Sequence, residues 1–110
     1  MRLPSAESAE VDIAKLRDYC LDPMHPIGKH KARAFAAALG IRAEQAWELR
    51  AALLDAARDM PAIPGEKDAY GERYMVDFGW TTQTGEAMLR SVWMVRSGED
   101  HPRLVTCFVL

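Results

Sequence analysis

The second half of the chain alternates apolar and polar residues with a period of two, and this pattern constrains the fold more than any other feature. In "ERYMVDFGW" one face would carry Tyr74, Val76, Phe78 and Trp80. The stretches "AMLRSVWMVR" and "RLVTCFVL" have the same character, and "TQTGE" and "SGEDHP" supply turns between them. Gly85 is expected at a hairpin position that needs positive φ. The pattern predicts three sequential strands in an antiparallel meander.

The first half has helical spacing, with apolar residues recurring every three or four positions. Helices are expected at about residues 11–20, 29–39 and 43–58. Asp12 or Ser8 could cap the first, and Gly40 is a natural left-handed residue after the second. The apolar anchors expected in the third are Trp47, Leu49, Leu53 and Leu54.

The two halves predict an α+β fold in a single domain, residues 1–110. The helical half covers about 10–58 and the β half about 70–110, and "PAIPGEKDAYGE" joins them. An isolated three-stranded sheet would leave one apolar face wet, so the helices must cover it. We therefore expect three N-terminal helices packed on one face of a three-stranded antiparallel meander.

Composition limits the partners and cofactors. The formal net charge of −2 argues against strong nonspecific nucleic-acid binding, so any anion site must be a local patch. Cys20 and Cys107 are widely separated, lack the paired spacing of zinc or redox sites and are expected in the core. No motif for a cofactor or metal is present. With no signal-peptide or membrane-span pattern, we expect a cytoplasmic protein.

The segment "HPIGKHKAR", residues 25–33, is the densest group of potentially cationic side chains. Free amides at the start of a helix attract anions, so Gly28, Lys29 and Arg33 are candidate anion-binding residues and Lys31 is a candidate for holding a phosphate. The alternative is that these cations form the solvated side of an amphipathic helix.

Three histidines could transfer protons. His25 is the best candidate, because it lies in a loop between two prolines that could hold it at the edge of a cleft. His30 is expected to be exposed, and His101 lies in a tight turn. A nonfunctional role is the alternative for each.

A second set of candidates lies on the strands: Arg90, Arg103 and Thr106. A guanidinium within an apolar run needs a partner or a cleft, because burying it unpaired is costly. A cross-strand pair with Asp77 is the alternative for Arg90, and the acidic turn at residues 99–100 is the alternative partner for Arg103.

Much of the chain resembles a small bacterial domain family of unassigned activity. The residues that carry the resemblance are "LPSAESAEVDIAKLRDYCLDPMHPIGKHKARAF", "YGERYMVDF" and "RSVWMVRSGEDHPRLVTCFVL". Family members typically have an "LPNAE" opening, an "HPxGxxKA" centre and a "PRLVTAYP" ending. This chain differs in ending "TCFVL" and in carrying His30 beside Lys31.

The resemblance implies a domain found alone or at the C-termini of larger secreted or phage-encoded chains, a layout similar to that of toxin domains. The order of helices followed by an antiparallel sheet also resembles the barnase, colicin and RelE group of RNA-cleaving folds, which is an analogy of fold.

The interpretation that unites these observations is toxin-like, metal-independent RNA cleavage or RNA-phosphate binding. His25 would act as base or acid, Lys31 with Arg90 or Arg103 would hold the phosphate, and Thr106 would donate a hydrogen bond. This requires Lys31, Arg90 and Thr106 to converge. The alternative is a non-catalytic protein-interaction module that docks a partner, or a second copy, through the edge of its last strand.

Overall fold

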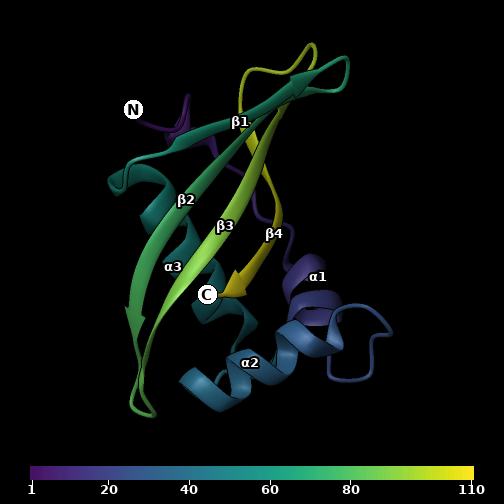
Figure 1. Ribbon diagram of the computed structural model, residues 1–110, viewed down its shortest axis with the longest axis vertical. Coiled ribbons are helices and arrows are strands. Elements are labelled where there is room, and N and C mark those ends of the chain that lie inside the picture. The colour runs from purple at the N-terminus through teal and green to yellow at the C-terminus, as the bar shows by residue number, and fades with distance from the viewer.

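The computed structural model describes all of residues 1–110 and confirms an α+β fold, with the helices preceding the strands (Figure 1). The helical elements are η1 (Ala6–Ser8), α1 (Ile13–Lys15), the π-helical turn η2 (Leu16–Cys20), α2 (Lys29–Leu39), η3 (Ala43–Gln45) and α3 (Ala46–Asp59). The strands are β1 (Ile63–Asp68), β2 (Gly71–Thr81), β3 (Glu86–Arg96) and β4 (Pro102–Val109). They form one antiparallel sheet in the order β1-β2-β3-β4.

The sheet has four strands, and not the three expected from the sequence. The additional strand, β1, lies within the stretch assigned to a linker and pairs with the first half of β2, from Asp68 opposite Gly71 to Ile63 opposite Met75. Every residue of β1 is exposed, so the strand has no apolar alternation by which the sequence could reveal it. Its Pro64 is tolerated because β1 is an edge strand.

One face of the sheet forms the core with the helices. Its buried residues on β2, β3 and β4 are Tyr74, Val76, Phe78, Leu89, Ser91, Trp93, Leu104 and Cys107. The one polar member, Ser91, donates to the backbone oxygen of Val76 at 2.7 Å and accepts from Nε1 of Trp93 at 2.8 Å. Because these bonds satisfy its hydroxyl, Ser91 can be buried without the penalty of an unpaired polar group.

The helical boundaries follow from local capping. Asp12 accepts a hydrogen bond from the amide of Ala14 at 2.9 Å, which confirms it as the cap of α1. Gly40 has φ 66° and ends α2 as expected, with amide bonds from Gly40 and Ile41 back into the helix. The apolar side of α2 buries Phe35 and Leu39.

Two expectations for individual residues are wrong. Trp47 is 65% exposed, because the face of α3 that enters the core begins with its neighbour Ala46 and continues through Leu49 and Leu53. Gly85 does not have positive φ. A Cβ there would lie 2.7 Å from the backbone oxygen of Ala38, so glycine permits the β2–β3 hairpin to approach α2 closely.

The helices of this chain are all too short or too polar to cross a bilayer.

Candidate functional site

The candidate site begins at His25, whose ring is hydrogen-bonded to the loop just before α2. Its Nδ1 accepts hydrogen bonds from the backbone amides of Ile27 at 3.0 Å and Gly28 at 2.9 Å. The His25 backbone oxygen accepts a third bond, from the amide of Lys29 at 3.1 Å. With Nδ1 occupied as an acceptor, the neutral ring carries its proton on Nε2, which is the nitrogen left to donate.

At Gly28 the backbone of this loop packs closely against the backbone of η2. A Cβ at Gly28 would lie only 2.1 Å from the backbone oxygen of Tyr19, so only glycine allows this contact. Its amide already donates to His25. The expectation that Gly28 would offer a free amide to an anion is therefore wrong, because that amide is hydrogen-bonded to Nδ1 of His25.

Lys31 and Tyr19 form the next contact. Nζ of Lys31 donates to the phenol oxygen of Tyr19 at 3.0 Å and lies 5.0 Å from the centre of its ring. The Tyr19 ring also contacts His25 in a T-shaped arrangement, with ring centres 4.8 Å apart and an interplanar angle of 87°. Tyr19 thus contacts both the imidazole and the ammonium group, and its phenol proton remains free to donate to a ligand.

Beneath Lys31 lies a pair of buried thiols, Cys20 on η2 and Cys107 on β4. Sγ of Cys20 is 3.9 Å from the hydroxyl oxygen of Thr106. Thr106 sits where β4 shifts register against β3, between Val92 and Trp93, and such irregularities re-aim side chains. This contact brings Thr106 to the same part of the molecule as Lys31.

The surroundings of Cys20 favour its thiolate form. A hydrogen bond from the thiol of Cys107 is the largest cause, and the amide of Cys107, the hydroxyl of Thr106 and the charge of Lys31 add to it, lowering the pKa of Cys20 to about 6. The pKa of Cys107 is raised, because it is hydrogen-bonded to Cys20, buried and close to a second negative charge. The first proton to leave the pair therefore leaves from Cys20.

A shallow hollow of about 380 Å³ opens beside Lys31, between α2 and the end of β4. Its lining consists of His30, Lys31, Ala34, Phe108 and Val109. No carboxylate lines it. An aromatic side chain beside cations is the combination that binds single-stranded nucleic acid, by base stacking and phosphate contact.

Arg90 does not join this group. Its Nε and Nη2 each lie 2.9 Å from an Asp77 carboxylate oxygen, which confirms the cross-strand pair. Arg90 stands between the buried residues Leu89 and Ser91, so it projects from the opposite, uncovered face of the sheet. The bond to Arg90 lowers the pKa of Asp77, which keeps the pair ionised near neutral pH.

Arg103 is likewise neutralised. Its guanidinium donates to Glu99 at 2.7 Å and to Glu10 at 2.6 Å, and His101 lies 3.0 Å from Glu10. Hydrogen bonding by Arg103 lowers the pKa of Glu99. The expected convergence of Lys31 with strand guanidinium groups is therefore wrong: Arg90 and Arg103 each have their own carboxylates.

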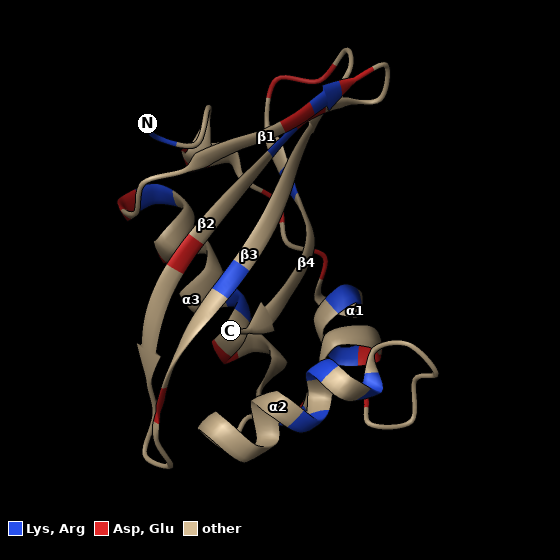
Figure 2. Cartoon of the chain, in the orientation of Figure 1, with Lys and Arg blue, Asp and Glu red and all other residues tan.

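The cationic segment, residues 25–33, differs from the strands in this respect. Each lysine and arginine on the four strands belongs to an ion pair: Lys67, Arg73, Arg90, Arg96 and Arg103. The salt bridges of the structure include none of His25, Lys29, His30, Lys31 and Arg33. Figure 2 shows α2 with blue segments and no red ones, whereas a red segment of β2 lies beside a blue one of β3.

Sequence reasoning brought His25, Lys31 and Thr106 to one part of the molecule but missed Tyr19. Its spacing from Leu16 suits the apolar side of the first helix, and its contact with Lys31 depends on how the loop folds back. The π-helical turn that carries Tyr19 and Cys20 is a further signal, since such turns are frequent at functional sites. No three His, Cys, Asp or Glu side chains gather where they could hold a metal ion.

Together these observations describe a small α+β domain with a candidate cationic site where η2, α2 and β4 meet, and no carboxylate lines the hollow of that site. A family model described as a domain of unknown function, DUF6883, matches residues 2–110, and the chain belongs to this family. A search of curated proteins gives no match.

Proposed function

We propose that this protein binds single-stranded RNA at the cationic segment and the adjoining hollow, and that Lys31, Tyr19 and His30, in place of the strand guanidinium groups expected from the sequence, support its cleavage without a metal ion. One observation carries the proposal. The cations of residues 25–33 have no carboxylate partners, although the rest of the chain is acidic enough to give a net charge of −2. Unpaired cations beside an imidazole and an aromatic ring suit a phosphodiester with its base.

Lys31 and Tyr19 are the groups proposed to contact the phosphate. The ammonium of Lys31 would neutralise the oxygens as charge develops, and the phenol of Tyr19, which accepts from Lys31, would donate its own proton to one of them. Phe108 would stack on a neighbouring base. Arg90 and Arg103 have no part in this proposal, because each is already bonded to carboxylates.

The proposed reaction is attack of the 2′-hydroxyl oxygen on the adjacent phosphorus. The bond from phosphorus to the 5′ oxygen breaks, giving a 2′,3′-cyclic phosphate and a free 5′-hydroxyl. His30, in the hollow with Lys31, would accept the 2′ proton and then return it to the leaving 5′ oxygen, while the Nε2 proton of His25 would donate a hydrogen bond to a phosphate oxygen. Thr106 would act through its contact with Cys20, supporting the site from below.

The test is incubation of the purified chain with a short single-stranded RNA in excess EDTA, with products identified by mass spectrometry. We expect a cyclic phosphate product, and no cleavage of the same sequence made as DNA. His30→Asn should lose roughly 100-fold or more in rate, because asparagine keeps a polar side chain in the hollow but cannot transfer a proton. Absence of cleavage by the unmodified chain, or equal cleavage by His30→Asn, would refute the catalytic proposal.

The toxin-like role implied by the family resemblance has its own test. Induced expression in a bacterial host should arrest growth, and Lys31→Ala should relieve the arrest. Lys67→Ala makes the same chemical change at a lysine paired with Glu72 and is the matched control. Arrest that persists with Lys31→Ala at equal protein levels would separate toxicity from this site.

A further inference from the structure

β2 is longer than the edge strand beside it, so half of β2 has a free edge. β1 pairs with β2 only as far as Met75, while β2 continues to Thr81. Residues 76–81 therefore have β3 on one side and no strand on the other. In Figure 1, β2 continues beside β3 beyond the first residues of β1.

The direction of the backbone groups on this edge follows from the β2–β3 hairpin. The amide of Thr82 donates to the oxygen of Gly85, so it points toward β3. Since backbone groups alternate sides along a strand, the amides and carbonyls of Asp77, Gly79 and Thr81 point the other way, to the free edge. They are the groups that an added strand would bond.

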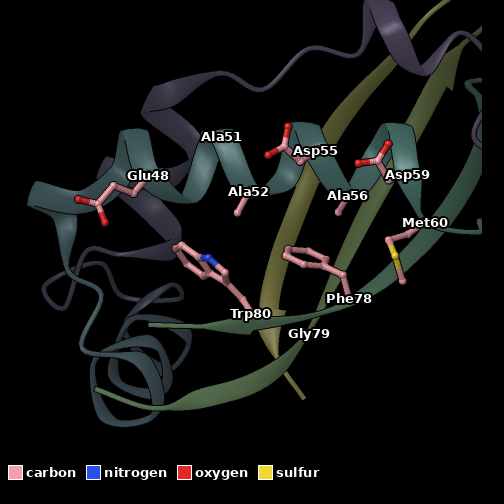
Figure 3. A pocket seen from close by; sticks show the side chains of 10 residues that line it. All are labelled: Glu48, Ala51, Ala52, Asp55, Ala56, Asp59, Met60, Phe78, Gly79 and Trp80. Atoms are coloured by element: carbon pink, nitrogen blue, oxygen red, sulfur yellow. The ribbon is translucent and has the colours of Figure 1, made fainter. Parts of the chain in front are cut away.

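A groove of about 540 Å³ runs along this edge, between β2 and α3. Its lining consists of Glu48, Ala51, Ala52, Asp55, Ala56, Asp59, Met60, Phe78, Gly79 and Trp80. Figure 3 shows Phe78, Trp80 and Met60 reaching into the space below α3, where alanines leave room. The floor is apolar and wide enough for side chains to enter.

The rim of this groove is acidic. Glu48, Asp55 and Asp59 stand along α3 in Figure 3, and no lysine or arginine is among the lining residues. Asp55 has an ion pair with Arg58, while Glu48 and Asp59 have none. We call this feature, with the edge of residues 76–81, the acidic groove. Its charge favours a cationic occupant and opposes RNA.

The edge of the last strand, expected from the sequence to be the docking edge, is partly occupied. The Glu10 amide donates to the oxygen of Pro102, and the Leu104 amide donates to the oxygen of Glu10, each at 2.9 Å. Farther along β4, α2 and η2 pack against the strand. The free edge that adjoins a groove is therefore that of β2.

We propose that the acidic groove binds an extended segment of a partner protein, rich in basic and apolar residues, as an added strand along β2. Main-chain bonds to Asp77, Gly79 and Thr81 would hold the segment, as in other cases of strand addition. Alternate side chains would enter the apolar floor or meet the carboxylates of Glu48 and Asp59. A second copy docking edge to edge would bring two acidic rims together, so a basic partner is favoured.

The probe is an acetylated eight-residue peptide that alternates lysine and valine, titrated into ¹⁵N-labelled protein. We expect shifts and slowed hydrogen exchange for the amides of Gly79 and Thr81, with those of α2 unchanged. A glutamate–valine peptide should not bind. A lysine–valine peptide N-methylated at alternate residues should bind at least about tenfold more weakly, because it cannot complete the ladder. Equal binding of the methylated peptide, or shifts confined to other regions, would overturn the proposal.

Charge reversal gives a second, independent measurement. Glu48→Lys with Asp59→Lys should weaken the lysine peptide at least about tenfold and create affinity for the glutamate peptide. Both residues are exposed on α3, so folding should be preserved, as a thermal melt can verify. Unchanged preference for the lysine peptide would overturn the proposal. This groove is separate from the RNA site, so failure of either proposal leaves the other standing.

Discussion

The cationic segment and the sheet use the same residue types in opposite ways. On the strands, antiparallel pairing places each arginine or lysine beside a carboxylate, as with Arg90 opposite Asp77. The cationic segment begins α2, where positive charges are unfavourable by about 0.3 to 1 kcal/mol each, and no acidic residue occupies the first turn. The difference indicates that the strand cations serve stability, whereas those of residues 25–33 are available to a ligand.

The largest expected effect comes from disturbing the contact that holds the cationic segment in place. Gly28→Ala puts a Cβ against the backbone oxygen of Tyr19, and we expect a loss of about 2 to 3 kcal/mol in the free energy of unfolding. The affinity for RNA should fall as well. Urea denaturation measures the free energy of unfolding, and fluorescence anisotropy with a labelled RNA measures the affinity.

Gly65→Ala is the matched control for this change. The nearest atom to a Cβ there is 3.4 Å away, so we expect little effect on either quantity. If Gly28→Ala proved as stable as Gly65→Ala, the loop would not be fixed by Tyr19 as described.

The Cys20–Cys107 pair should make the free energy of unfolding depend on pH, an effect of intermediate size. The folded chain loses its first thiol proton near the lowered pKa of Cys20, about 6, while an unfolded cysteine holds its proton to about pH 8.5. Between these values the unfolded chain binds more protons, so stability should rise with pH, by about 1 kcal/mol per unit. Above about pH 8.5 the stability should fall again, because the raised pKa of Cys107 makes the folded chain hold a proton that the unfolded chain loses.

Urea denaturation between pH 6 and pH 9 would measure this slope, with Cys20→Ser as the control that should flatten it. A wild-type chain whose stability is independent of pH across this window would show that no thiolate forms in the pair.

A smaller effect should follow from giving the sheet an unpaired cation. Asp77→Asn removes the charge that neutralises Arg90 while keeping the size of the side chain. We expect RNA affinity to rise about two- to threefold at low salt, with a steeper salt dependence, because one more cation can meet a phosphate. Adding Arg90→Ala should cancel the gain, and no gain at all would mean that pairing does not decide which cations bind RNA.

The smallest expected effect is a loss of stability at acid pH. Arg90 lowers the pKa of Asp77, and Arg103 lowers that of Glu99. The stabilisation from these pairs is complete above the usual carboxyl pKa near 4 and is lost as pH falls through the lowered values. The urea midpoint should therefore decline below pH 4, and slightly less so in Asp77→Asn; an identical decline in both chains would argue against a contribution from this pair.

The sequence predicted the features that local patterns determine. Alternation located β2, β3 and β4 and made Asp77 the partner of Arg90, while Gly40 marked the end of α2. β1 could not be found in this way, because an edge strand with both faces in water needs no apolar residues. Nor could the contact between Tyr19 and Lys31, which depends on a loop whose path is set by the backbone contact at Gly28.

The comparison between the cationic segment and the sheet is tested most directly by measuring how tightly two lysine variants bind RNA. Lys31→Ala removes an ammonium without a carboxylate partner, and Lys67→Ala removes one paired with Glu72. For a fluorescently labelled single-stranded RNA at fixed salt, we predict that Lys31→Ala raises Kd at least about tenfold and that Lys67→Ala leaves it within about twofold. Equal Kd values for the two variants would contradict the assignment of the cationic segment as the RNA site.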